Sequence, residues 1–114
     1  MTLEERVALL EFQAELLFNN TQIDRLFFET KITREQYRDI MNLMDSFRSK
    51  LDNGEEVHHY DFENGIYEIV PSRRGDYHFC ELIAELFAED GRWTEVFPAL
   101  YGNMPKYGGS MNQE

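Results

Sequence analysis

The densest group of side chains that could hold a metal ion is His58, His59 and Asp61, which His78 could join after folding. A structural zinc site needs tetrahedral nitrogen and sulfur ligands, which proteins usually present in recognisable pairs. Adjacent histidines in a loop rarely point at one ion, and His78 and Cys80 diverge on a helix because residues two apart do not share a face. A small metal-dependent enzyme or sensor is therefore a minor hypothesis, and we expect no metal and no other cofactor.

Cys80 is the only cysteine of the chain, so an internal disulfide is impossible and a reducing compartment is indicated. A catalytic thiol needs a pKa that is lowered by a nearby base or by a helix start. His78 is close in sequence, but the apolar pattern around Cys80 predicts a small side chain that faces the core. The sequence has no phosphate loop and no nucleophile with an attendant base, and we expect a protein that is not an enzyme.

The corner that follows Gly91 contains arginine, tryptophan and tyrosine, the residue types that are favoured at protein-binding surfaces. Packing in the core or between subunits is the alternative explanation for these aromatic residues, and it is the favoured one. The acidic helix faces offer another docking surface. The candidate protein-binding residues on these two surfaces are Arg92, Trp93, Phe97, Tyr101, Glu85 and Glu89.

The charge of the chain is strongly acidic, with 11 Lys and Arg against 22 Asp and Glu and a formal net charge of −11. A protein that binds nucleic acid normally carries a basic face, because neutralised phosphates supply much of its affinity. We therefore expect no direct binding to nucleic acid. Solvated helix faces explain the acidity most simply. The alternative explanation is mimicry of a nucleic-acid backbone, or docking on a basic protein surface.

The elements that must position these residues are predicted to be helices, and three of their starts are marked by cap patterns. In each pattern a threonine is followed three residues later by a polar residue. The three pairs are Thr2 with Glu5, Thr21 with Asp24, and Thr33 with Gln36. The predicted helices run over residues 3–19, over a short segment that reaches Phe28, and from Thr33 to about residue 52, where Asn53-Gly54 ends the third.

The second half of the chain is predicted to contain shorter helices. Residues 54–60 are the best loop candidate, and residues 61–70 fit either a helix or a short strand. We favour the helix because no partner strand is evident, although Asn64-Gly65 weakens it. Asp76 is expected to cap a further helix, and the segment around Pro98 should be short or kinked. The predicted core residues of the helix after Asp76 are Phe79, Leu82, Ile83, Leu86 and Phe87.

The first predicted helix has two apolar stripes. One follows heptad spacing and consists of Leu3, Val7, Leu10, Ala14 and Leu17, and the second consists of Leu9, Phe12 and Leu16. Together they make an apolar face that is wider than a two-stranded coiled coil needs. We therefore expect this helix to be contacted on more than one side.

These patterns resemble the YhaI-like domain of unknown function, a family of small all-helical proteins from Bacillus and its phages. The resemblance covers roughly residues 3–101 and rests on the segments 3–10, 24–28, 33–51 and 87–97. It implies helical subunits that intertwine in a homo-oligomer, with a trimer favoured. The family brings no established activity, and none of these motifs is catalytic.

The sequence therefore predicts an all-α fold, with a multihelical domain over residues 1–101 and a flexible C-terminal tail over 102–114. The first residues are acidic where a signal peptide is basic, and no apolar run approaches the ~18 residues that suggest a membrane span. We expect a cytoplasmic, non-enzymatic regulator or inhibitor that binds another protein and acts as a homo-oligomer, without contact to a membrane. The alternative is an acidic nucleic-acid mimic, encoded by a phage, that blocks a DNA-binding or defence protein of the host.

Overall fold

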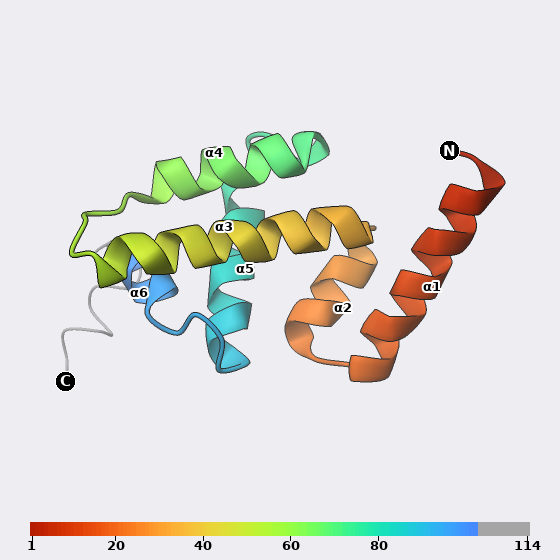
Figure 1. The fold of residues 1–114 in the computed structure, drawn as a ribbon, viewed down its shortest axis with the longest axis horizontal. Helices are drawn as coiled ribbons and strands as arrows, with labels where there is room; N and C mark the ends of the chain where they lie inside the picture. Colours follow the sequence, from red (N-terminus) through yellow and green to blue (C-terminus); the bar gives the residue numbers. More distant parts are fainter. Residues whose placement is uncertain (103–114) are drawn as a thin grey trace.

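The computed structural model describes residues 1–102, and within this range it confirms the all-α fold, because the described residues form helices and no strand (Figure 1). The tail predicted over 102–114 lies outside the described residues, except for Gly102. The elements are α1 (Leu3–Asn19), α2 (Gln22–Glu29), α3 (Arg34–Asp52), α4 (His59–Ile69), the short 3-10 helix η1 (Pro71–Arg73), α5 (Tyr77–Glu89) and α6 (Val96–Tyr101).

The predicted caps form, and they define where the helices begin. Thr2 and Thr33 each complete a capping box, in which the hydroxyl and the side chain three residues on satisfy backbone N–H groups that have no partner within the helix. Thr21 caps α2, and the carboxylate of Asp76 accepts from the backbone N–H of Phe79 at 3.2 Å at the start of α5. Gly91 follows α5 in the left-handed conformation, with φ +79°.

The ambiguous stretch over residues 61–70 is part of a helix, as favoured. The α4 helix begins at His59, so the loop predicted over 54–60 is shorter at its C-terminal end. Gly65 sits in this helix for a packing reason: a Cβ atom there would lie 2.9 Å from Cδ1 of Leu43 on α3. The glycine that weakens the helical pattern in the sequence thus lets α4 approach α3 closely. The α6 helix, which contains Pro98, is short as predicted.

The long α3 helix is the centre of the arrangement. The α4 helix returns alongside it, α5 crosses behind α3, and α6 lies near the C-terminal end of α3 (Figure 1). The α2 helix packs on α5, and α1 lies at the far end of the molecule, beyond the start of α3. The molecule is elongated as a result, with extents of 50 × 26 × 25 Å.

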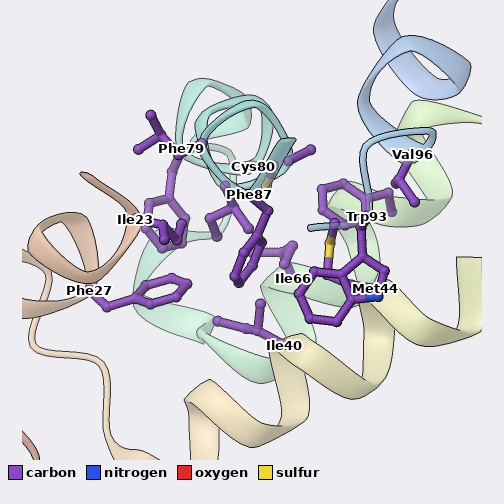
Figure 2. Packing of buried hydrophobic residues seen from close by; sticks show 14 of the residues in the cluster. Ile23, Phe27, Ile40, Met44, Ile66, Phe79, Cys80, Phe87, Trp93 and Val96 are labelled. Carbon is purple, nitrogen blue, oxygen red and sulfur yellow. The ribbon is translucent and has the colours of Figure 1, made fainter. Parts of the chain in front are cut away.

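The core lies where α2, α3, α4 and α5 meet (Figure 2). Ile23 and Phe27 from α2, Ile40 from α3 and Ile66 from α4 all have no exposed surface. Phe87 from α5 lies among them, with its ring centroid 5.9 Å from that of Phe27. Burial of such side chains stabilises a fold by about 1.5–3 kcal/mol each. The core therefore fixes the relative positions of the four helices.

One predicted core residue lies at the surface instead. Leu82 is 37% exposed, whereas its predicted companions Phe79, Ile83, Leu86 and Phe87 are buried. The buried face of α5 also includes Cys80 and Ala84. The centre of this face is therefore turned away from Leu82 around the helix axis. Leu82 is predicted as a core residue from its helical spacing to Phe79 and Leu86, and the packing of α5 leaves it outside.

Candidate functional site

The four candidate metal ligands are not brought together. His58 is the exposed residue before the first turn of α4, and its ring stacks on that of Tyr60 at 5.6 Å. Asp61 is exposed in the first turn of α4, and His78 is exposed on α5. Among residues 1–102 no group of three or more histidine, cysteine, aspartate or glutamate side chains is placed to hold a metal ion.

His59 instead takes part in a half-buried polar contact that sequence reasoning missed. Its Nδ1 atom lies 3.4 Å from Oε2 of Glu63, one turn further along α4. The same Glu63 oxygen accepts a hydrogen bond of 2.8 Å from the hydroxyl of Tyr101 on α6. Burial and this hydrogen bond raise the pKa of Tyr101 above its ordinary value. The carboxylate of Glu63 requires a donor because it is inside the fold, and Tyr101 supplies one. The contact therefore joins α4 and α6.

Cys80 is buried on α5, as the sequence predicted. Burial raises the pKa of its thiol to about 12, because the charged thiolate is disfavoured away from water. The Sγ atom lies 3.7 Å from the carbonyl oxygen of Asp76, to which the thiol donates. A thiol of this kind is neutral and inaccessible at physiological pH, so it is unsuited to nucleophilic catalysis.

The aromatic corner is a packing feature rather than an exposed docking surface, and this corrects its candidacy. Trp93 is 8% exposed and Tyr101 is fully buried. Trp93 lies within the buried cluster (Figure 2), and its ring meets that of Phe87 edge-on at 4.9 Å. Its indole N–H donates to Oδ1 of Asp45 on α3 at 2.8 Å. The favoured alternative, packing in the core, therefore describes both aromatic residues.

The other candidate protein-binding residues lie closer to the surface. Arg92 is half-buried, with its guanidinium over the Phe87 ring at 4.8 Å and its Nε donating to Asp90 at 3.1 Å. Phe97 and Glu85 are half-buried. Glu89 is exposed and lines a shallow hollow between α5 and the start of α2. Arg92 and Phe97 contact the buried aromatic residues: the Arg92 guanidinium lies 5.7 Å from the centroid of the Trp93 ring, and the Phe97 ring centroid lies 5.7 Å from that of Tyr101.

A more distinctive surface lies on α1. The stripe of Leu9, Phe12 and Leu16 faces the rest of the molecule, and Phe12 and Leu16 are buried. The heptad stripe points largely the other way, because successive residues of a helix are turned by about 100°. We call this heptad stripe the outer stripe; it consists of Leu3, Val7, Leu10, Ala14 and Leu17. Its leucine and valine side chains are 74%, 46%, 64% and 49% exposed in chain order.

The inner side of α1 is held to the start of α3 by a few contacts. The Phe12 ring meets that of Tyr37 edge-on at 5.4 Å, and the Arg34 guanidinium lies over Phe12 and hydrogen-bonds to the Glu15 carboxylate. Two hollows of about 400 and 320 Å³ follow one another between these helices, and both are lined by Arg34 and Arg38. The helix is thus anchored on one side and uncovered on the other.

Charge is distributed unevenly along the molecule. Residues 1–38 contain five Lys or Arg and seven Asp or Glu, a net charge of −2. Residues 39–102 contain five Lys or Arg and fourteen Asp or Glu, a net charge of −9. The end of the molecule that carries the exposed apolar stripe is therefore close to neutral, whereas the remaining body is acidic.

Comparison with known proteins found no matching family model, no similar curated protein and no similar solved structure. The resemblance to the YhaI-like family stays a prediction. None of the helices within residues 1–102 combines the length and the apolar character that crossing a membrane requires.

Proposed function

We propose that this chain is a non-enzymatic regulator or inhibitor that acts by binding protein, and that it works as a homo-oligomer, with a trimer favoured. The outer stripe of α1 is the observation that carries this proposal. Soluble monomers rarely expose contiguous apolar patches, and a patch rimmed by polar residues marks an interaction site. Leu3, Leu10 and Phe18 are each more than half exposed on this one helix, and Phe18 is 90% exposed.

The free energy available from burying the outer stripe also supports a protein-binding function. Each square ångström of apolar surface removed from water contributes roughly 25 cal/mol, so the exposed leucines would gain several kcal/mol of gross hydrophobic free energy on docking. Association entropy consumes much of this gain. The core of the same chain is otherwise well covered, since the large apolar side chains of α2 to α6 are mostly buried. The exposure is thus concentrated on one helix.

The residues considered for catalysis do not favour an enzyme. Within residues 1–102 no three candidate ligands are placed to hold a metal ion, and Cys80 is buried with a raised pKa. Protein contact is therefore the function that the described side chains support best.

The proposal is tested by affinity capture from the lysate of the native host, with wild type and two leucine variants as bait. Leu10→Glu places a charge in the outer stripe, and Leu82→Glu makes the same change at an isolated exposed leucine on α5. We expect proteins that are captured by the wild type and by Leu82→Glu but lost with Leu10→Glu. An identical set for all three baits would contradict a docking role for α1. Circular dichroism must show that both variants keep their helices.

The acidic body supports a second candidate function, mimicry of nucleic acid. Asp52, Glu55, Glu56 and Asp61 lie within ten residues around the loop between α3 and α4, and all four are exposed. A mimic predicts capture of a DNA-binding or defence protein that weakens at moderate salt and is competed by nucleic acid. Such capture should persist with Leu10→Glu and be lost when Glu55 and Glu56 are reversed to lysine. Salt-resistant capture that depends on Leu10 would instead favour apolar docking.

A further inference from the structure

The outer stripe of α1 has the dimensions of a short coiled-coil seam. Its residues step by four and three from Leu3 to Leu17, which keeps them nearly in line along the helix. With a rise of about 1.5 Å per residue, the stripe is about 21 Å long. The spacing matches two heptads, with leucines at three of the five positions. A partner that fits such a stripe is another helix with the same spacing.

Charged residues on the two edges of the stripe make it complementary to itself. In heptad terms Leu3, Leu10 and Leu17 occupy d positions, so Arg6 lies at a g position and Glu11 at an e position. In a parallel pair, each g residue faces the e residue that is five positions later on the other helix. Arg6 of one copy then faces Glu11 of its neighbour, and the contact repeats at each seam of a symmetric parallel assembly, including the favoured trimer.

The antiparallel arrangement lacks this complementarity. There e residues face e residues, so the edge that carries Glu4 and Glu11 would meet the same acidic edge of the other copy. Like charges that face each other across a seam are destabilising, whereas opposite charges set orientation. The edges of the stripe therefore favour one direction over the other.

The fold keeps the acidic bodies apart in the parallel arrangement. The inner side of α1 faces the body of its own chain, and the outer stripe points away from it. Pairing through the outer stripes therefore places the two bodies on opposite sides of the paired helices. The net charge of −9 over residues 39–102 is held away from the seam, and only the nearly neutral N-terminal ends meet.

We propose that the outer stripe of α1 is covered by the same stripe of another copy of this chain, parallel and in register, with Arg6 of each copy paired to Glu11 of its neighbour. This rests on the proposed function in one respect, that the outer stripe of α1 docks protein. It adds the identity of the occupant and its direction. Partner capture that is lost with Leu10→Glu then reports a partner that binds the assembled oligomer.

Charge reversal tests the pairing. Sedimentation equilibrium over a wide range of concentration should show that Arg6→Glu and Glu11→Arg each weaken self-association about tenfold, because the attractive pairs become repulsive. The double variant should recover most of the wild-type affinity, since the pair is restored with opposite sense. Arg74→Glu is the matched control, because this exposed arginine directly follows η1, does not line the hollows beside α1, and should leave association unchanged. Double-variant affinity no better than that of the single variants would overturn the Arg6–Glu11 pairing.

Single cysteines test the direction. In a Cys80→Ser background, Leu3→Cys and Leu17→Cys should each form a covalent dimer with its own kind on oxidation, because parallel helices in register place equal residues opposite each other. Cross-linking only in a mixture of the two variants would show an antiparallel seam and overturn the proposal. Tyr60→Cys, an exposed position on α4, measures the background of random collision.

Failure of this inference is distinguishable from failure of the proposed function. A wild type that stays monomeric at every concentration would overturn the second copy as occupant. Capture of another protein that depends on Leu10 would then still support protein docking on α1. Self-association that follows the charge reversals, combined with no captured partner, would instead support the parallel seam and count against the regulator.

Discussion

At the scale of single residues, two hydrogen bonds of the buried aromatic corner join distant parts of the chain. Tyr101 donates to Glu63 across 38 residues, and Trp93 donates to Asp45 across 48 residues. Both bonds satisfy groups whose burial without a partner would cost roughly 1–3 kcal/mol. These bonds hold Trp93 and Tyr101 against α3 and α4, so the two side chains are buried rather than exposed for binding.

The buried thiol of Cys80 predicts a loss of stability in alkaline solution. Its ordinary pKa is 9.0, and burial raises it to about 12 in the folded protein. Because the folded state prefers the neutral thiol, the full stability is present below pH 9 and is lost as the pH rises through about 12. Tyr67 acts in the same sense, since burial raises its pKa from 10.0 to about 12. Each group contributes a slope of at most about 1.4 kcal/mol per pH unit.

Urea denaturation at a series of pH values measures this effect as the free energy of unfolding. We expect that free energy to fall above pH 9, and to fall less steeply in Cys80→Ala just above pH 9, which is below the ordinary pKa of Tyr67. The comparison uses slopes, because removal of the sulfur also lowers the overall stability. Equal slopes for the variant and the wild type would mean that the thiol titrates alike in the folded and unfolded chain.

At the scale of elements, the sequence predicts what is local and misses what depends on neighbours. Caps act within four residues, so Thr2, Thr21 and Thr33 are visible in the sequence and begin helices in the structure. Gly65 is the contrary case, because its reason is Leu43 on another helix, twenty-two residues earlier. The prediction that Leu82 is buried was wrong for the same reason, because the orientation of α5 in the core decides its exposure and local spacing does not.

The capping boxes of α1 and α3 predict different consequences for the same substitution. Thr33→Ala should lower the free energy of unfolding by about 1 kcal/mol, because α3 carries the central contacts and cannot fray without loosening the core. Thr2→Ala should leave it nearly unchanged, since the first buried residue of α1 is Phe12 and the turns before it can open alone. Urea denaturation measures the first effect, and amide hydrogen exchange in α1 measures the second.

An equal loss of global stability in both variants would contradict this division. It would indicate that the start of α1 is held as firmly as α3, for example by another subunit. The comparison should therefore be made at low protein concentration, where association contributes least.

At the scale of the whole molecule, the sequence predicts the helical class, while the structure adds direction. The two stripes of α1 are visible in the sequence and suggest one wide face, but the packing on α3 separates them into an anchored side and an uncovered side. The net charge of −11 and its concentration outside residues 1–38 can also be read from the sequence. The structure adds that α1 lies at one end of the long axis, so the nearly neutral segment is at one end of the molecule. Neither the uncovered side of α1 nor the position of the charge along the molecule follows from periodicity, because each depends on how the helices pack.

The excess of acid predicts that added salt stabilises this protein. Repulsion within a body of net charge −9 opposes folding, and the Debye length falls to about 10 Å at about 0.1 M salt, which screens that repulsion. An exposed ion pair such as that of Arg48 with Glu95 contributes little, so its loss to screening costs little. We therefore expect Tm to rise by a few degrees from about 0.01 to about 0.3 M NaCl.

Replacing both Glu55 and Glu56 by lysine changes the formal net charge from −11 to −7, because each replacement exchanges a negative charge for a positive one. This variant should show a smaller rise in Tm with salt. A Tm that falls with salt in the wild type would mean that the ion pairs outweigh the repulsion, and the acidic body would then be stabilised by pairing rather than strained by its charge.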